Sequence, residues 1–253
     1  MLIAPAMAIG SGYYRPLVEE FQRHGWEARA LGRRGFERDQ PRASRSTDWS
    51  YRDEIDDITH AVAEERAEKP HRPILLLGHS LGGQLVAGHE ATRSPVDGVI
   101  TVGGAIPHYR HFAYAGLPLA ALAAVVVPTA TALCGYLPKP AFGGPGARTF
   151  MREWAGMVLS GNPPFPADRP IETPALIVSL DGDTLSPESA VDDLAARLFD
   201  PAAVTRWHCT DDDLSAGASN DHIAWVRTPE HVVSRTQSWW SGMVASRSSR
   251  PQA

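Results

Sequence analysis

Two patterns of apolar positions alternate along the chain. Short apolar runs occur at 74–77, without interruption, and at 174–180, with only Ser179 polar, and such runs are typical of parallel strands that are covered on both faces. Stripes of apolar residues at helical spacing lie between the runs, as at Ile55, Ile58 and Val62. This alternation predicts an α/β fold with a mainly parallel, doubly wound sheet and helices on both faces.

The same patterns predict where the individual elements lie. Prolines end the second helix, and a glycine is a plausible stop for the first. The arginine-rich stretch 32–50 is polar and indicates an exposed loop. The expected strands are 1–6, 26–31, 74–77, 96–102, 174–180 and 204–209, and the expected helices are 17–25, 51–67, 81–92, 189–198 and 229–244.

The alternation breaks between Pro107 and Pro170. This stretch is rich in Pro, Gly, Ala and Trp, and its 64 residues are too many for a plain loop. It therefore indicates a helical cap or lid inserted at the carboxyl ends of the strands. The expected organisation is a core of 1–106 and 171–246, a cap of 107–170 and a flexible tail of 247–253.

One part of the cap is apolar enough to be compared with a membrane span. No charged residue occurs from Phe112 to Pro138, and length alone would permit a span. Pro118 and Pro128 interrupt the stretch, however, and strand and helix patterns lie on both sides of it. We therefore expect a buried or pocket-covering helix pair and no transmembrane span. The first residues have no basic region before their apolar run, so they indicate a strand and not a signal peptide.

Composition narrows the function classes. The formal net charge is −5 and the isoelectric point is about 6.0, whereas nucleic-acid binders usually carry a basic patch. Cys134 and Cys209 are far apart and lack metal-ligand spacing, which argues against disulfides and zinc and favours the cytoplasm. No phosphate-binding loop, His-x-x-x-His pair or dinucleotide fingerprint occurs. We therefore expect no nucleic-acid partner, no metal and no cofactor.

The chemistry-bearing motif is Gly78-His79-Ser80-Leu81-Gly82, between a predicted strand and a predicted helix. The two glycines permit a sharp, strained turn that lifts the Ser80 hydroxyl above the sheet. The helix that follows directs its first N–H groups, including that of Leu81, toward developing negative charge. This context favours Ser80 as a nucleophile.

A nucleophilic serine needs a base and an orienting acid, expected in the chain order Ser, Asp, His. Asp181 and Asp183 both follow the strand 174–180, and either could serve as the acid. His222 lies after the last strand and before the last helix, which makes it the candidate base. His79, beside the nucleophile, is expected to pack next to the turn.

These motifs resemble the α/β-hydrolase superfamily. Gly78–Gly83, Asp183-Thr-Leu-Ser-Pro187 and His222-Ile-Ala-Trp225 carry this resemblance, which extends from Leu2 to about Val244. Other stretches, at 5–8, 14–15, 48–53, 135–138 and 152–154, resemble a subgroup of uncharacterised bacterial hydrolases. The spacing from the acid to the proline implies Asp183 rather than Asp181. Many relatives carry a two-strand hairpin before the first parallel strand, whereas this chain opens directly on that strand.

The resemblance implies a serine hydrolase. His222 would take the Ser80 proton during attack on an acyl carbonyl, while Asp183 holds the imidazole. The oxyanion would be bound by the N–H groups of Leu81 and Met7, the second because superfamily members place a donor just after the first strand.

Aromatic residues of the cap are candidates for an apolar pocket roof, and we expect Tyr114, Phe142 and Trp154 to contact the substrate. The predicted activity is cleavage of a carboxylic ester, thioester or lactone with an apolar acyl part. Two alternatives remain: a biosynthetic tailoring enzyme of acyltransferase or lyase type, and a non-catalytic protein that binds a small ligand on the same fold. An apolar cap surface could also support a homodimer.

Overall fold

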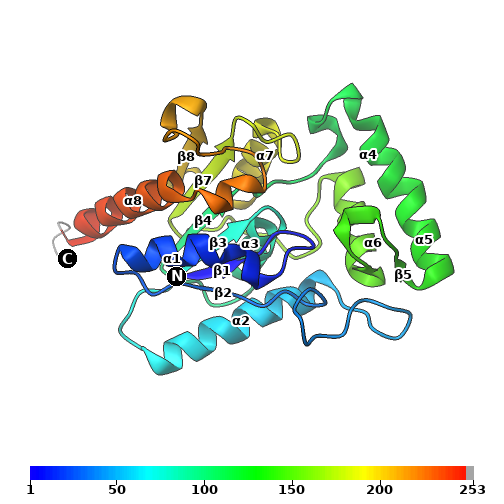
Figure 1. Ribbon diagram of the computed structural model, residues 1–253, viewed down its shortest axis with the longest axis horizontal. Helices are drawn as coiled ribbons and strands as arrows, with labels where there is room; N and C mark the ends of the chain where they lie inside the picture. Colours follow the sequence, from blue (N-terminus) through cyan, green and yellow to red (C-terminus); the bar gives the residue numbers. More distant parts are fainter. Residues whose placement is uncertain (249–253) are drawn as a thin grey trace.

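The central feature of the computed structural model, which describes residues 1–248, is one sheet of six parallel strands (Figure 1). The strand order is β2-β1-β3-β4-β7-β8. Every residue of β3, β4 and β7 is buried, as expected for strands covered on both faces. The strands are β1 (Leu2–Ala4), β2 (Arg29–Ala30), β3 (Leu75–His79), β4 (Gly98–Val102), β7 (Ala175–Leu180) and β8 (Val204–Cys209).

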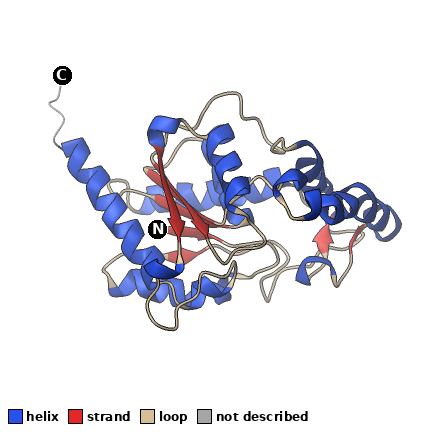
Figure 2. Cartoon of the chain, turned by 90° about the horizontal axis from the view of Figure 1, so that it is seen from above, coloured by secondary structure: helices blue, strands red, loops and turns tan. Residues whose placement is uncertain are grey.

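Helices cover both faces of this sheet (Figure 2). Side chains alternate between the faces along each strand, so that Leu76 packs in one core cluster while Leu75 and Leu77 pack in the other. The first cluster includes residues of α2 (Tyr51–Glu68), α3 (Leu81–Thr92) and α7 (Glu188–Leu198), and the second includes residues of α1 (Arg15–Arg23) and α8 (Glu230–Ser248). The predicted doubly wound parallel fold is confirmed.

The local signals that begin the helices are visible in the structure. Helix α2 begins with a capping box, in which the Ser50 side chain accepts a hydrogen bond from the Asp53 N–H and the Asp53 carboxylate accepts one from the Ser50 N–H. Helix α1 has Pro16 in its first turn, where the missing N–H of proline does no harm.

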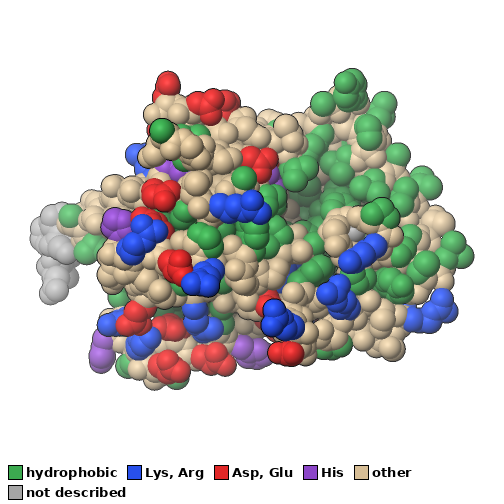
Figure 3. Space-filling view, in the orientation of Figure 1, with side chains coloured by type: hydrophobic (Ala, Val, Ile, Leu, Met, Phe, Trp, Pro, Cys, Tyr) green, Lys and Arg blue, Asp and Glu red, His purple; other side chains and the backbone are tan. Residues whose placement is uncertain are grey.

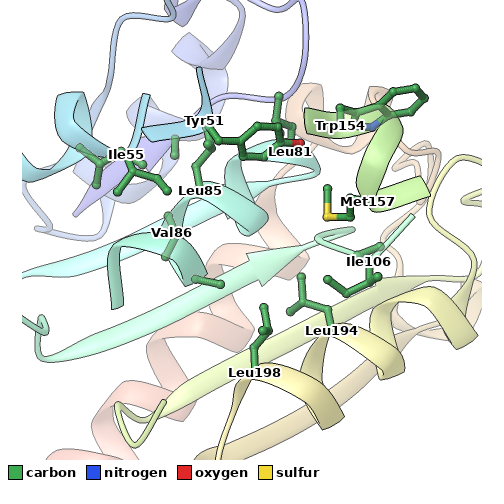
Figure 4. Packing of buried hydrophobic residues seen from close by; sticks show 14 of the residues in the cluster. Tyr51, Ile55, Leu81, Leu85, Val86, Ile106, Trp154, Met157, Leu194 and Leu198 are labelled. Carbon is green, nitrogen blue, oxygen red and sulfur yellow. The ribbon is translucent and has the colours of Figure 1, made fainter. Parts of the chain in front are cut away.

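Segment 107–170, which we call the inserted segment, lies between β4 and β7 in the chain, at the opposite end of the molecule from α8 (Figure 1). Its helix α6 joins the first core cluster, where Trp154 and Met157 lie near Leu81 of α3 and Leu194 of α7 (Figure 4). Its elements are η2 (Tyr109–His111), η3 (Tyr114–Gly116), α4 (Leu117–Ala121), the π-helical turn η4 (Leu122–Val126), α5 (Val127–Cys134), β5 (Tyr136–Leu137), η5 (Ala141–Gly143), β6 (Gly146–Ala147) and α6 (Arg148–Ser160).

The apolar stretch of the inserted segment is one continuous helix, formed by α4, η4 and α5 (residues 117–134), which we call the outer helix. The helix pair expected here is therefore a single helix, and of the two expected arrangements, buried or pocket-covering, burial is wrong. Within residues 1–248, the helical stretch Tyr114–Cys134 is long and apolar enough to cross a membrane by length and composition alone, and only 17% of its most apolar 18 residues are buried. The π-helical turn widens the helix just before Pro128, whose ring would otherwise meet the preceding turn.

The outer helix lies on the rest of the protein with its inner face. This inner face packs against α6 of the same segment and contains the buried residues Ala123, Val127 and Thr131. The Arg152 Nε of α6 donates a hydrogen bond of 2.9 Å to Thr131 Oγ1. The other face of the helix is exposed. This packing against α6 shows that the helix is a layer of the folded domain.

Three expectations about smaller elements need correction. The strand expected at 26–31 is reduced to β2, which pairs with β1 over two residues. The stretch 32–50 is only partly exposed, because Arg33 is buried in an ion pair with Glu54 of α2. The tail expected at 247–253 is wrong for residues 247 and 248, which belong to α8 (Glu230–Ser248), and residues 249–253 lie outside the described part of the chain.

Helix α3 starts so close to strand β1 that a side chain has no room at Gly82. A Cβ there would lie 2.0 Å from the Ala4 carbonyl oxygen. We expect Gly82→Ala to lower the free energy of unfolding by at least about 3 kcal/mol, or to prevent folding, because backbone on both sides would have to move. Chemical denaturation, together with the yield of folded protein, measures this.

Gly156→Ala is the matched control. Gly156 lies inside α6, and nothing lies within 4 Å of a Cβ built there. The same substitution should raise stability at this site by about 0.5–1 kcal/mol through the helix preference of alanine. Equal tolerance of both substitutions would contradict the steric argument.

Candidate active site

Ser80 occupies the sharp turn between β3 and α3. Its backbone has φ 54° and ψ −118°, a strained conformation for a residue with a side chain. The Ser80 N–H donates to the Val102 carbonyl of β4 at 2.9 Å, which fixes the turn to the neighbouring strand. At Gly78 a Cβ would lie 2.4 Å from the Gly82 carbonyl oxygen, so the turn closes only with glycine on both sides of the serine.

The structure brings Ser80, His222 and Asp183 together at the carboxyl ends of the strands. The Ser80 Oγ lies 2.9 Å from His222 Nε2, and His222 Nδ1 lies 2.5 Å from Asp183 Oδ2. Because a carboxylate only accepts, His222 Nδ1 carries the proton, and Nε2 is free to accept the Ser80 hydroxyl proton. The imidazole and the carboxylate are buried, so water competes little for these hydrogen bonds.

The second oxygen of Asp183 is also held. Asp183 Oδ1 accepts the N–H groups of Leu185 and Ser186 at 2.8 and 2.7 Å. The other candidate acid, Asp181, is exposed and lies 3.5 Å from His208 Nε2, away from His222. Of the two aspartates that follow β7, the structure therefore places Asp183 against the histidine.

His79 and Tyr14 form a buried chain of hydrogen bonds behind the triad. The Tyr14 hydroxyl accepts the Ala6 N–H at 2.7 Å and lies 2.7 Å from His79 Nδ1, and His79 Nε2 lies 2.7 Å from the His222 carbonyl oxygen. A carbonyl only accepts, so His79 carries its proton on Nε2 and Tyr14 donates to Nδ1. One chain of side chains thus ties the loop after β1 to the loop that holds His222.

Burial sets the protonation states in this chain. It lowers the pKa of His79 to about 3 and, with the nearby His222 opposing a second positive charge, keeps the ring neutral. Burial also raises the pKa of Tyr14, so its hydroxyl stays protonated. A neutral ring with one N–H and one acceptor is what these partners require.

Two backbone N–H groups beside Ser80 are unpaired within residues 1–248. They belong to Leu81, the first residue of α3, and to Met7, which follows β1. Both residues line the same cavity as Ser80. Ala8, next to Met7, has a φ of 60°, a strained turn that directs the loop toward the cavity.

The cavity next to Ser80 has a volume of about 500 Å³, and its lining is mostly apolar. Phe142 and Trp154 line it as expected and meet edge to face at 4.8 Å. The structure does not place Tyr114 there: its side chain is 87% exposed at the start of the outer helix. Further lining residues are Ile9, Gln84, Ala105, Pro107, Phe112, Leu119, Leu185, Ser186 and Ile223.

Sequence reasoning missed two polar residues of this region. Gln84 lies one helical turn after Ser80, a spacing that would have placed it on the same face of α3. Its amide N–H donates to the Ala105 carbonyl, and its oxygen accepts the Tyr51 hydroxyl. Tyr14 belongs to one of the stretches that resemble the bacterial subgroup, but the sequence gives it no role, because its partners are brought to it only by the fold. Among residues 1–248, no group of three or more His, Cys, Asp or Glu side chains is arranged to hold a metal ion.

Comparison with known proteins places this site in a family. The model of the serine aminopeptidase S33 family matches residues 1–153, more than half of the chain. The chain therefore belongs to this family and, with its fold, to the α/β-hydrolase enzymes. The resemblance to the α/β-hydrolase superfamily is confirmed. None of the curated proteins matches the chain.

Solved structures agree on the fold. The monoacylglycerol lipase of Paleococcus ferrophilus is 18% identical, over 83% of this chain and 84% of its own, with a TM-score of 0.56. A lipase-esterase related protein of Clostridium acetobutylicum is 12% identical, over 94% and 93%, with a TM-score of 0.61. An α/β serine hydrolase homologue of Coxiella burnetii is 14% identical, over 93% and 83%, with a TM-score of 0.54.

Removing the Tyr14 hydroxyl should destabilise the protein strongly. Tyr14→Phe leaves the Ala6 N–H and His79 Nδ1 buried without partners, so we expect the free energy of unfolding to fall by about 2–4 kcal/mol. Tyr13→Phe is the control, because the partly buried Tyr13 donates only one bond of 3.1 Å, to the Ile223 carbonyl. Urea denaturation of both variants measures the difference. Similar losses of unfolding free energy in the two variants would contradict the argument that the Tyr14 hydroxyl bonds both Ala6 and His79.

His79 should make stability depend on pH. Because its folded pKa of about 3 lies below the ordinary value of 6.5, the unfolded chain binds its proton first, and stability falls as pH drops below 6.5. Between pH 7 and pH 5, His79→Gln should lose about 2 kcal/mol less stability than the parent protein. Each protein is compared with itself at the two pH values, so any cost of the substitution that does not depend on pH cancels. Parallel pH profiles would refute it.

Proposed function

We propose that the protein is a serine hydrolase that cleaves a carboxylic ester, thioester or lactone with an apolar acyl part. The observation that carries the proposal is the hydrogen-bonded line Ser80–His222–Asp183 at the wall of an apolar cavity. Serine, histidine and acid in this geometry activate a hydroxyl for acyl transfer on several unrelated folds.

In the proposed reaction, Ser80 Oγ attacks the acyl carbon while its proton passes to His222 Nε2. Asp183 stabilises the imidazolium that forms and keeps the proton on Nδ1. The leaving alcohol or thiol then takes the proton from Nε2 as the bond to the acyl carbon breaks. Water, activated by His222, attacks the acyl-enzyme, and the proton returns to Ser80 with release of the acid.

The negative oxygen of the tetrahedral intermediate would be bound by the Leu81 and Met7 N–H groups. Their lack of protein partners and their place at the cavity wall support this role. The amino end of α3 adds a favourable dipole. Each such donor is worth about 3 kcal/mol of transition-state stabilisation.

The proposed substrate follows from the cavity lining. Phe142 and Trp154 come from the inserted segment, which would act as a cap over the acyl chain, and Phe112 and Leu119 extend the apolar wall. Such a lining gains free energy by removing a hydrocarbon chain from water. A small-molecule acyl substrate is the proposed partner.

The proposed location is the cytoplasm. Cys134 and Cys209 are both free thiols, and a reducing compartment keeps thiols in this state.

The first test is covalent labelling. A fluorophosphonate probe should add one adduct to the pure protein, detected by intact mass, and Ser80→Ala should abolish it. Ser186→Ala is the matched control, because this serine lines the same cavity and its N–H group, not its side chain, holds Asp183. Labelling that survives in Ser80→Ala, or is absent from the folded parent protein, would overturn the proposal.

The acyl preference is a separate prediction. Hydrolysis of p-nitrophenyl esters should become faster, as kcat/KM, from acetate to medium chains. Phe142→Ala should reduce kcat/KM for a medium-chain ester about tenfold or more, because it removes a large part of the apolar contact, and should affect acetate much less. Faster cleavage of short polar esters would contradict the apolar acyl site.

A further inference from the structure

The outer helix presents an apolar face to solvent. Most exposed helix faces in globular proteins carry charged side chains, but no charged residue occurs from Phe112 to Pro138. Leu117, Val125 and Leu133 are 67%, 61% and 71% exposed. A contiguous apolar surface of this kind usually marks a site of interaction with a partner or a lipid.

This apolar surface continues into the cavity. Phe112, just before the outer helix, and Leu119, within it, line the cavity next to Ser80. Leu185 also lines the cavity and is 61% exposed. Figure 3 shows hydrophobic side chains gathered over this part of the molecule around a hollow, with Lys and Arg side chains bordering them.

Charge around the helix identifies the occupant. The chain has a net charge of −5, yet no acidic residue occurs between Asp97 and Glu153. At the carboxyl end of the helix, Arg45 Nη2 donates to the Leu133 carbonyl at 2.8 Å, and the exposed Lys139 follows shortly after.

The amino end of the helix also carries a cation. Gly116 lies against the backbone of Tyr109, and the Arg110 guanidinium stacks on the Tyr109 ring at 5.6 Å. None of Arg45, Arg110 and Lys139 belongs to the ion pairs described within residues 1–248. The apolar face therefore has unneutralised cations at both ends.

We propose that the outer helix docks on an anionic lipid bilayer, with its apolar face in the headgroup–acyl boundary and Arg45, Arg110 and Lys139 against lipid phosphates. Amphipathic helices bind membranes in this way, through apolar burial combined with attraction to anionic lipids. The exposed Tyr114 at the helix start is of the type that lies at the membrane–water interface.

A second copy of the chain fits this surface less well. A two-fold contact pairs the same patch on both partners, and an antiparallel pair of outer helices would bring Arg110 of one copy near Lys139 of the other. The segment between Asp97 and Glu153 offers no acid to compensate. Anionic lipid headgroups supply that charge.

Docking would set the cavity mouth against the bilayer, so that an apolar acyl substrate passes from lipid to Ser80 without crossing water. This consequence rests on the proposed function, whereas docking itself does not. The two are separable, because vesicle binding needs no turnover and Ser80→Ala should bind vesicles as the parent protein does.

The test is flotation with vesicles of phosphatidylcholine, with and without phosphatidylglycerol, at low and high salt. The protein should bind the anionic vesicles at least about tenfold more tightly, and salt should weaken this binding. Arg110→Gln and Lys139→Gln should each lower the affinity about fivefold. Arg235→Gln, on α8, is the matched control and should change nothing.

The apolar contribution is tested by Val125→Glu with Leu133→Glu, which should lower vesicle binding at least tenfold. Ala202→Glu with Ala216→Glu adds the same charge at exposed positions beside β8 and should retain more of the binding. Fluorophosphonate labelling of each variant reports whether the site is intact. The proposal is overturned if the parent protein does not bind anionic vesicles, or if the variant with Val125→Glu and Leu133→Glu binds them as well as the control variant. It is also overturned if light scattering shows that the parent protein is a dimer and that Val125→Glu with Leu133→Glu dissociates it.

Discussion

The close approach of α3 to β1 determines how the site is built. Gly82 places the helix backbone against the Ala4 carbonyl with no space for a side chain, and this contact positions the first turn of α3 over the sheet. Ser80 is then held in a strained turn, with its N–H bonded to β4. Because strain at one residue costs about 1–3 kcal/mol, it persists only where surrounding contacts outweigh it, and here the two buried neighbouring strands supply those contacts.

The buried chain Tyr14–His79 extends this arrangement to the other loops. It connects the turn after β1, which carries Met7, to the carbonyl of His222. The short contact of 2.7 Å between His79 Nε2 and the His222 carbonyl places the His79 proton on Nε2, so Tyr14 donates to Nδ1 and the chain also selects a tautomer. Ser80, His222 and the loop that carries Met7 are thus joined by one connected set of hydrogen bonds inside the domain.

The inserted segment has two faces with different surroundings. Through Phe142, Trp154 and Met157 it faces the cavity and the first core cluster. The outer helix leaves an apolar face in solvent, which costs free energy that the fold does not recover by itself. In the proposed arrangement, a lipid surface recovers it and the cavity opens toward the same surface.

The sequence alone determined the fold class, the order of the main elements and the positions of Ser80, Asp183 and His222. These follow from local rules: buried parallel strands need apolar runs, a strand–turn–helix needs small residues at fixed spacing, and Asp183 and His222 lie in the connections that follow two neighbouring strands, β7 and β8. The choice between Asp181 and Asp183 came from resemblance, and the structure places Asp183 against His222.

Only the tertiary structure decided which side chains meet over long distances. Tyr14 and His79 are 65 residues apart, and nothing local predicts their bond. The outer helix is a second feature that the sequence could not decide. An apolar run predicts a buried helix because core residues are usually apolar, but whether a helix face is covered depends on what packs against it. The outer helix packs with one face on α6 and leaves Tyr114 and Leu117 in solvent, because no other element of the described chain reaches that side.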